Sequence, residues 1–349
     1  MEELTISGRA IGPAHSPYVI AEIGANHNGD LDLCRRLIDA AVESGADAVK
    51  FQSWTKDSLI SRAEYQRNTR YRQNGAAPSL EEAVERYQLG SEGLRTVAKV
   101  CRARGVVWFA SCFAHAEVDL LESLEVPAYK IASMDVNHLP LLDSVGRTGK
   151  PVLLSTGMAT LGEVERALAA LRDAGSGPVA LLHCVSSYPC PPEQVNLRML
   201  ATWRQAFDVP VGYSDHTLGT PVPLAAVALG ACAIEKHFTL SRELEGWDHA
   251  ISADPVELRG LVDGARAVFA AMGSAARVMG TAELEKRKVF RRRMVAVRAL
   301  KSGERITAGD VEFKRPGTGI QPDELTYVVG RRLTRDVAPE EELEWADLA

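Results

Sequence analysis

Apolar and polar positions along the chain alternate between two repeating patterns. Runs rich in β-branched and other apolar residues, typical of buried strands, occur eight times, at 18–24, 48–52, 106–112, 128–133, 151–157, 179–185, 210–216 and 233–239. Between them lie segments with apolar residues at helical spacing, most clearly 31–44, 91–104, 161–174 and 255–272. Eight strands alternating with eight helices predict an α/β fold, the (β/α)8 or TIM barrel.

Two departures from this repeat define the expected domains. The polar stretch 54–90 is too long for a simple loop, so we expect a partly helical insertion over the mouth of the barrel. After about residue 285, short strand-like pieces surround glycine-containing turns. We therefore predict a catalytic barrel at 1–280, a linker at 281–293 and a small β-rich domain at 294–349. An open doubly wound sheet is the alternative, but the first run lacks a Gly-x-Gly-x-x-Gly turn.

Composition excludes several classes of protein. The chain has 349 residues and a formal net charge of -6. Its longest apolar run, 222–234, falls short of the roughly 18 residues that cross a membrane and contains Pro223 and Gly230. The six cysteines include no Cys-x-x-Cys pair. We expect a cytoplasmic protein with reduced thiols and no membrane partner.

The charge is unevenly distributed. Residues 286–336 hold 14 Lys and Arg against 6 Asp and Glu, whereas 337–349 hold 5 acids and no base, which leaves -9 on the first 285 residues. A basic segment on an acidic body suits either nucleic acid or a small anion. The basic run at 286–293 lacks interleaved aromatic residues, so we expect no nucleic acid and interpret the run as a linker or a solvated helix face.

Polar residues gather at the end of every predicted strand, which in a barrel is the active-site face. They are Glu22, Lys50, Gln52, Ser111, Lys130, Ser133, Ser155, Ser186, Tyr188, Ser214, His216, Glu235 and His237. The lysines and serines together suit a phosphate or carboxylate group. His216 and His237 lie at equivalent depths on neighbouring strands, so they form either a two-histidine metal site or an acid and base. Glu235 is expected to pair with a lysine.

Seven segments carry a resemblance to a known family. They are AEIGANHNG (21–29), VKFQ (49–52), YKIAS (129–133), LLSTGM (153–158), LHCVSSYP (182–189), GYSDHTLG (212–219) and EKHFTL (235–240). In this order they resemble the sialic acid synthase (NeuB) family, which includes N-acetylneuraminate, pseudaminate and legionaminate synthases. The tail at 290–320 is similar to the antifreeze-like, or SAF, domain of that family.

The resemblance implies a reaction and a set of partners. Family members condense phosphoenolpyruvate with an open-chain N-acyl hexosamine, such as N-acetylmannosamine, and water, giving a nine-carbon 2-keto-3-deoxy sugar acid and phosphate. It also implies a domain-swapped homodimer and a divalent metal, Mn²⁺ with Mg²⁺ or Co²⁺ as alternatives. Because that reaction needs no Schiff base, Lys50, Lys130 and Lys236 are expected to bind anions.

The resemblance implies a role for each matching residue. The catalytic residues would be Glu22, His216 and His237, and the two histidines would hold the metal. Phosphoenolpyruvate would be bound by Lys50, Ser111, Lys130, Ser133, Ser155, Ser186 and Ser214. The sugar would be bound by Gln52, Asp135, Tyr188, Asp248, Phe290 and Arg315, the last supplied by the partner subunit.

Three departures from the family pattern leave the acceptor sugar open. Ser111-Cys112 replaces a Thr-Pro pair, Asp135 replaces a Glu, and Ser186 stands where sialic acid synthases tend to have Asn. The acceptor could be N-acetylmannosamine, a 2,4-diacetamido-trideoxyhexose or another aldose, as in the pseudaminate or spore-coat polysaccharide type. Two other hypotheses remain: a Schiff-base aldolase working from Lys50 or Lys130, and a non-enzymatic carbohydrate-binding module.

Overall fold

The computed structural model describes residues 3–68 and 79–349 and divides into two compact units, Met1–Gly273 and Ser274–Ala349. Each unit has its own hydrophobic core. Among the described residues, no helix combines the length and apolar character needed to cross a membrane.

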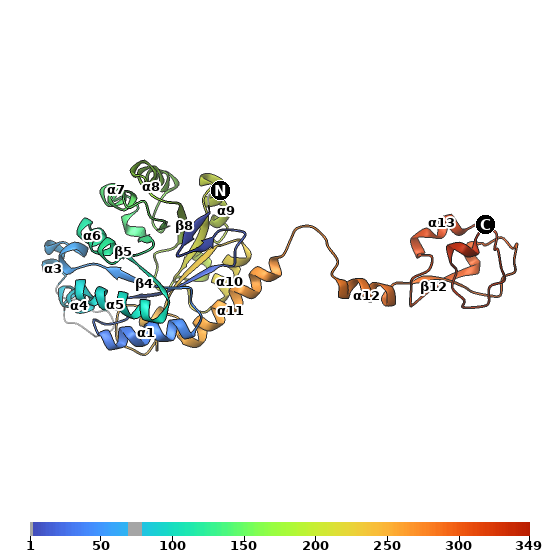
Figure 1. The fold of residues 1–349 in the computed structure, drawn as a ribbon, viewed down its shortest axis with the longest axis horizontal. Helices are drawn as coiled ribbons and strands as arrows, with labels where there is room; N and C mark the ends of the chain where they lie inside the picture. The colour runs from blue at the N-terminus through green and yellow to red at the C-terminus, as the bar shows by residue number, and fades with distance from the viewer. Residues whose placement is uncertain (1–2, 69–78) are drawn as a thin grey trace. The chain divides into compact units, whose positions relative to one another are not determined.

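The first unit is a closed barrel of parallel strands in the order β10-β3-β4-β5-β6-β7-β8-β9, which confirms the predicted fold (Figure 1). The strands are β3 (Tyr18–Gly24), β4 (Ala48–Ser53), β5 (Val107–Cys112), β6 (Tyr129–Ile131), β7 (Val152–Ser155), β8 (Val179–Cys184), β9 (Val211–Asp215) and β10 (Ala233–His237). The surrounding helices are α1 (Leu31–Glu43), α5 (Gly90–Arg104), α6 (His115–Ser123), α7 (Leu139–Gly146), α8 (Leu161–Ala174), α9 (Met199–Phe207), α10 (Pro221–Ala228) and α11 (Pro255–Met272).

An N-terminal hairpin, β1 (Leu4–Ile6) and β2 (Arg9–Ile11), closes one end of the barrel. Its residues Leu4, Ile6 and Ile11 are buried in a cluster with inward-facing residues such as Phe109 and Leu182. The sequence analysis missed this hairpin because three-residue strands give too few positions for a period of two to register. One end of the barrel interior is therefore apolar, and polar chemistry is confined to the other end.

The insertion was predicted to be partly helical, and it contains the helices α2 (Lys56–Leu59), α3 (Arg62–Arg67) and α4 (Leu80–Tyr87). Residues 69–78 of the insertion lie outside the described residues. It forms an aromatic cluster in which the rings of Trp54 and Tyr87 lie 5.8 and 5.1 Å from the ring of Trp247. Phe113, which follows β5, belongs to the same cluster. The insertion thus packs against residues that follow the carboxyl ends of the barrel strands.

The second unit begins with α12 (Thr281–Phe290) and continues with the antiparallel strands β11 (Arg293–Ala296) and β12 (Val311–Lys314) and the short helix α13 (Leu325–Val328). Its core contains Met294, Leu300, Ile320 and Leu343. The residues expected to form a linker therefore include a helix, and the basic run is its solvent-exposed end. Short 3-10 helices occur in both units, at Ser133–Asp135, Pro192–Gln194, His249–Ile251, Ala308–Asp310, Pro322–Glu324 and Trp345–Asp347.

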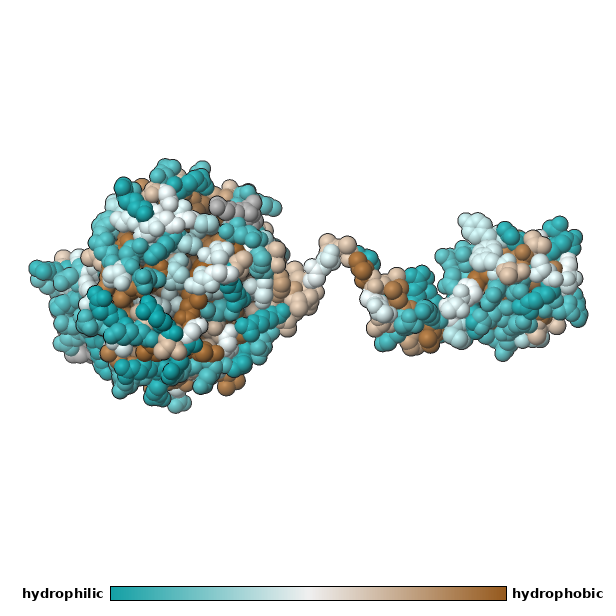
Figure 2. All heavy atoms as spheres, viewed as in Figure 1, coloured by the Kyte–Doolittle hydropathy of each residue, from teal (hydrophilic) through white to brown (hydrophobic). Residues whose placement is uncertain are grey.

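The barrel surface seen in Figure 2 is mostly hydrophilic, interrupted by small apolar patches. This matches a core that lies between strands and helices, where residues such as Leu37, Val97, Leu141 and Leu261 are fully or almost fully buried.

Two helical glycines should respond in opposite ways to alanine. At Gly146, where α7 packs on α8, a Cβ would lie 2.5 Å from Ala174 Cβ and 2.9 Å from the Leu171 carbonyl oxygen. At the exposed Gly260 in α11, no atom lies within 4 Å of the position of a Cβ. We expect Gly146→Ala to lower the free energy of unfolding by about 1–3 kcal/mol through overpacking. Gly260→Ala should raise it by about 0.5–1 kcal/mol.

Urea unfolding of the full-length chain, followed by tryptophan fluorescence, measures both changes. Equal effects, or a more stable Gly146→Ala variant, would contradict the close contact between α7 and α8.

Candidate active site

A cavity of about 260 Å³ lies at the carboxyl ends of the barrel strands, and every strand contributes a residue at its end or just past it. It is lined by Glu22, Lys50, Gln52, Ser111, Phe113, Lys130, Ala132, Ser133, Met134, Ser155, Met158, Cys184, Ser186, Tyr188, Ser214, His216, Glu235 and His237. Alternate residues of a strand face the same side, which is why Ser214 and His216, and Glu235 and His237, enter together. A larger hollow in the second unit, beside α12, contains none of the predicted site residues.

Three serine hydroxyls in the cavity accept hydrogen bonds from nitrogen donors. Lys50 Nζ donates to Ser111 Oγ over 3.0 Å, and Lys130 Nζ donates to Ser155 Oγ over 2.6 Å. The Gly157 amide donates to Ser133 Oγ over 3.0 Å. A hydroxyl has a single proton, and none of these three bonds uses it. Ser111 and Ser155 therefore each retain an O–H donor for an anion in the cavity, whereas the Ser133 hydroxyl is also hydrogen-bonded to Cys184.

Gly157 provides the space in which two of the hydroxyls converge. A Cβ at this residue would lie 2.5 Å from Ser186 Oγ and 2.7 Å from Ser133 Oγ. A side chain here would turn both hydroxyls away from their present positions, so the glycine keeps this corner of the cavity open.

Two glutamates compensate the buried lysines. Glu22 Oε2 lies 2.9 Å from Lys50 Nζ, and its Oε1 accepts a hydrogen bond of 2.8 Å from Gln52 Nε2. Glu235 Oε1 lies 3.8 Å from Lys50 Nζ and 3.9 Å from Lys130 Nζ, which confirms the expected ion pair. Ser214 Oγ donates to that same oxygen over 3.2 Å. Unlike Ser111 and Ser155, Ser214 has therefore committed its proton.

The pKa values of the two carboxyl groups, Glu22 and Glu235, are shifted in opposite directions. Burial raises the pKa of Glu22 above its ordinary value, and the nearby Glu235 adds to this effect. Burial also acts to raise the pKa of Glu235, but the ammonium groups of Lys130 and Lys50 outweigh it and the pKa falls below the ordinary value. Pairs of groups driven apart in this way mark acid and base roles. Glu22 therefore holds a proton more readily than Glu235 does.

The lysines differ as well. Burial lowers the pKa of Lys130, whereas at Lys50 the carboxylates of Glu22 and Glu235 outweigh burial and raise the pKa. Lys50 is thus the more firmly charged of the two.

The rings of His216 and His237 lie 5.5 Å apart, centre to centre. His216 Nδ1 donates to the Val185 carbonyl over 2.8 Å, so that Nε2 carries the lone pair when the ring is neutral. Burial acts to lower the pKa of this ring, but its contacts with Cys184 and the Val185 carbonyl outweigh burial and raise the pKa. Burial lowers the pKa of His237 to about 4, so its ring is neutral at pH 7. His237 Nδ1 is buried without a hydrogen bond, and Asp248 Oδ2 lies 3.7 Å from it.

This donor set fits a divalent transition metal, for which neutral imidazole is a preferred ligand. Both rings line one cavity, and neither Nε2 has a hydrogen-bond partner in the described parts of the chain. Residues 3–68 and 79–349 contain no cluster of three or more His, Cys, Asp or Glu suited to holding a metal. The protein thus offers two ligands, and water or substrate oxygens would complete the coordination.

The amino acids predicted to bind the sugar are divided between the barrel and the second unit. Gln52 and Tyr188 line the cavity, whereas Asp248 stands beside His237 and Asp135 lies in the turn after β6. Phe290 and Arg315 both belong to the second unit, where the guanidinium carbon of Arg315 lies 5.8 Å from the centre of the Phe290 ring.

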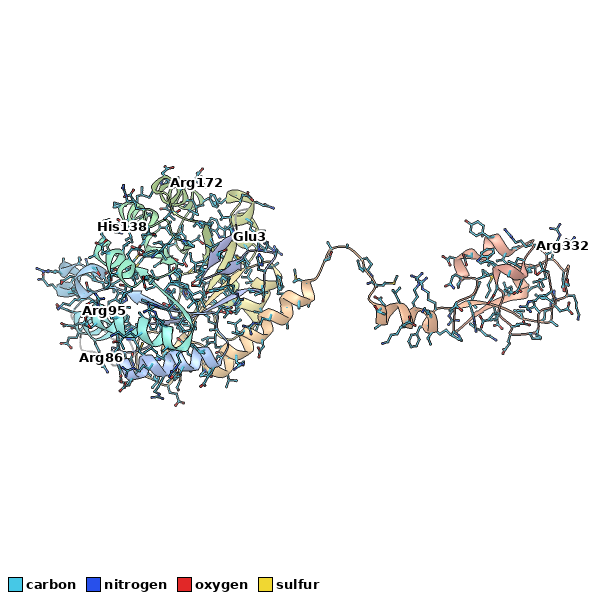
Figure 3. The ribbon with its side chains drawn as sticks, in the orientation of Figure 1. Glu3, Arg86, Arg95, His138, Arg172 and Arg332 are labelled. Atoms are coloured by element: carbon cyan, nitrogen blue, oxygen red, sulfur yellow. The ribbon has the colours of Figure 1, made fainter. Side chains whose placement is uncertain are left out.

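The expectation that Lys236 binds an anion is wrong. Its Nζ lies 2.6 Å from Asp215 Oδ2, and neither residue lines the cavity. Lys236 and His237 are adjacent on β10, so they face opposite sides of the strand. In Figure 3, the labelled side chains of His138 and Arg172 lie at the periphery of the barrel, away from its central strands.

Five lining residues carried no signal that could be recognised in the sequence: Phe113, Ala132, Met134, Met158 and Cys184. Apolar residues and a cysteine near a strand end are equally typical of a core. Met158 is 72% exposed and has φ of 61°, an unusual backbone for a residue with a side chain, and only the folded chain reveals this.

Comparisons with known proteins agree across both units. The NeuB family model matches residues 37–277, and the SAF domain model matches 291–349. The chain is 40% identical to a Methanocaldococcus jannaschii protein of uncharacterized function, over 100% of this chain and 99% of the relative. It is 38% identical to the N,N'-diacetyllegionaminic acid synthase of Legionella pneumophila, over 96% and 95% of the two chains. A solved N-acetylneuraminic acid synthetase from Leptospira borgpetersenii superposes with a TM-score of 0.74 at 33% identity, covering 82% of this chain and 95% of that one.

Asp135 should make stability depend on pH. Its Oδ2 is buried without a hydrogen bond, and burial raises its pKa to about 6 from 3.8. Folding therefore favours the protonated form, so this stability is present below about pH 4 and is lost as the pH rises through 6. Relative to Asp135→Asn, the wild type should lose about 1–3 kcal/mol of unfolding free energy between pH 4 and pH 7.

Urea unfolding of both proteins across this range measures the difference. Asp57→Asn is the control, because the side chain of Asp57 is 76% exposed. Parallel stability profiles for the wild type and Asp135→Asn would contradict the burial of this carboxyl group.

Proposed function

The chain belongs to the NeuB family, and on that premise we propose that it is a nonulosonic acid synthase. It would condense phosphoenolpyruvate with an open-chain N-acyl hexosamine and water, releasing phosphate and a nine-carbon 2-keto-3-deoxy sugar acid. As an enzyme it would be a carbon–carbon bond-forming transferase.

One observation carries this proposal: the hydroxyl oxygens of Ser111, Ser133 and Ser155 accept from N–H donors, and the protons of Ser111 and Ser155 are committed to no partner in the described parts of the chain. Together with the ammonium groups of Lys50 and Lys130, they form a set of donors with one polarity, which suits a phosphate and a carboxylate in a single ligand. Ser186 adds a hydroxyl at the Gly157 corner. Ser214 would join the set only by giving up its bond to Glu235.

The chain's own residues would act in sequence on the bound substrates. The lysines and serines hold the phosphate and carboxylate while the enol carbon attacks the aldehyde carbon. Positive charge then develops at C2 of the former phosphoenolpyruvate, and water adds there. Glu22 takes the proton from that water, a task for which its raised pKa suits it. The carbon–oxygen bond to phosphate then breaks.

His216 and His237 would hold a divalent metal, Mn²⁺ in the first instance with Mg²⁺ or Co²⁺ as alternatives, through the two Nε2 atoms. When bound, it supplies Lewis-acid polarisation of the aldehyde oxygen. Asp248, beside His237, and Tyr188, whose ring lies 4.1 Å from that of His216, border this part of the cavity. They are candidates to contact the sugar, together with Gln52 and Asp135.

The acceptor that best fits is one with two N-acyl groups. The Legionella relative is named for N,N'-diacetyllegionaminic acid, which carries two acetyl groups. This relationship favours a 2,4-diacetamido hexose over N-acetylmannosamine as the first substrate to test.

The proposal extends to a homodimer in which Arg315 acts across the subunits. Arg315 and Phe290 lie close together in the second unit, where Phe290 is 56% exposed. An exposed aromatic ring beside a guanidinium suits a sugar that carries polar groups. The six free cysteines are compatible with a cytoplasmic location.

The function is tested by phosphate release from phosphoenolpyruvate with a panel of N-acyl aldoses, followed by product mass. We expect release that depends on both acceptor and metal, with the diacetamido sugar best. His237→Ala should lower kcat at least about 100-fold, because metal binding and aldehyde polarisation fail together. Its unfolding midpoint should stay close to that of the wild type.

A Schiff-base aldolase predicts a different set of results. Because burial lowers the pKa of Lys130, its amine is the best candidate nucleophile. Borohydride with pyruvate would then trap Lys130 or Lys50, and a chelator would have no effect. Trapping, or full activity of metal-stripped enzyme, would contradict the synthase.

Arg315→Ala should raise the acceptor KM about 10-fold and change kcat and the phosphoenolpyruvate KM little, because it removes a contact to one substrate only. Arg305→Ala, in the same unit, is the control. An unchanged acceptor KM, either in this variant or after removal of 286–349, would contradict the role of the second unit.

A further inference from the structure

We propose that the buried ion pair of Lys236 and Asp215 is a positioning device that sets the distance and orientation of the two imidazoles, His216 and His237. This inference rests on the metal site of the proposed function. It concerns the side of the β9–β10 pair that faces away from the cavity, where Asp215 and Lys236 contribute nothing to the lining of the site.

Strand geometry places this pair directly behind the histidines. Asp215 and Lys236 are register partners on β9 and β10, and each immediately precedes one of the histidines. Because successive side chains alternate across a strand, the histidines enter the cavity and the ion pair faces outward. The ion pair and the two histidines are thus one residue apart along each chain segment, and they lie on opposite sides of the barrel wall.

Three short hydrogen bonds link Lys236, Asp215 and Thr217, the residue that follows His216. Lys236 Nζ donates to Asp215 Oδ2 over 2.6 Å and to the Thr217 carbonyl over 2.7 Å. The Thr217 amide donates to Asp215 Oδ1 over 2.8 Å. Both backbone polar groups of Thr217 are therefore fixed by the ion pair, and the backbone on each side of His216 is tied to β10.

His237 depends on this backbone more than His216 does. The His216 ring is held by its own bond to Val185, whereas His237 Nδ1 has no hydrogen bond. The position of the His237 ring thus follows from the path of β10, to which Lys236 belongs. A shift of β10 by a fraction of an ångström would change the distance between the ring nitrogens of His216 and His237, which would bind the same metal ion.

Stability alone does not account for a charged pair at this place. The two side chains are 1% and 0% exposed, so both ions have lost their hydration. Well-packed apolar residues often stabilise a fold as much as a buried ion pair does, because they avoid that desolvation. What apolar residues lack is direction, and three charge-assisted hydrogen bonds specify a single geometry.

The test uses the full-length, metal-stripped chain and Co²⁺ as the probe, followed by its visible absorption. The variant Lys236→Met/Asp215→Asn removes the ion pair without leaving an unpaired charge. We expect Co²⁺ to bind at least about 10-fold more weakly, as is usual when groups behind metal ligands are changed. The unfolding midpoint should change little. Asp215→Asn alone, which keeps the shape of the side chain, should give a smaller loss in the same direction.

The matched control is Lys150→Met/Glu122→Gln, which removes an ion pair of the same 2.6 Å length near β7. Its Co²⁺ affinity should equal that of the wild type. If the Lys236→Met/Asp215→Asn variant binds Co²⁺ as tightly as the wild type, the positioning role is overturned and the metal site is not. If the double variant does not fold, the same result with Asp215→Asn has the same meaning. Failure of the wild type to bind one Co²⁺ overturns the metal site itself and this proposal with it.

Discussion

Burial of charge at one end of the barrel is the constraint on which the rest of the structure depends. Lys50, Lys130, Glu22 and Glu235 are each at most 6% exposed, and an ion without water costs several kcal/mol unless partners replace the water. The partners are one another and the surrounding serines. This requirement explains why each lysine donates to a serine and why Glu235 stands between two ammonium groups. The cavity thus combines two buried ammonium groups and several hydroxyl groups in one lining.

The other features of the barrel keep that cluster dry and fixed. The N-terminal hairpin fills the opposite end of the interior with apolar side chains, so the polar groups cannot be solvated from below. The insertion contributes Trp54 and Tyr87 to a cluster with Trp247 and Phe113, and Phe113 also lines the cavity. A low local dielectric strengthens every interaction among the charges, and it is also what separates the pKa values of Glu22 and Glu235. Burial, pairing and acid–base assignment are therefore consequences of the same arrangement.

The uneven charge of the chain is consistent with two different electrostatic tasks. The first 285 residues carry -9, yet the cavity gathers two lysines and hydroxyl donors, so cations are placed locally within an acidic body. The second unit carries the basic helix end of α12 and pairs Arg315 with Phe290. Membership of the NeuB family accounts for both units in one chain.

The sequence alone determined the barrel and nearly all of the residues that meet in the cavity, because period-two alternation and polar strand ends are local properties. It did not reveal the hairpin, whose strands are too short for a period, or the apolar lining at Met134 and Met158, which resembles core. It misassigned Lys236, because Lys50, Lys130 and Lys236 all stand in strands and one residue of offset decides which side of the wall a side chain faces. Only the tertiary structure decided that offset, and with it which lysine receives an anion and which is paired with Asp215. The physical reason is that the alternation of side chains along a strand is a local property of the sequence. Which of the two sets of side chains faces the cavity is decided by the closed barrel.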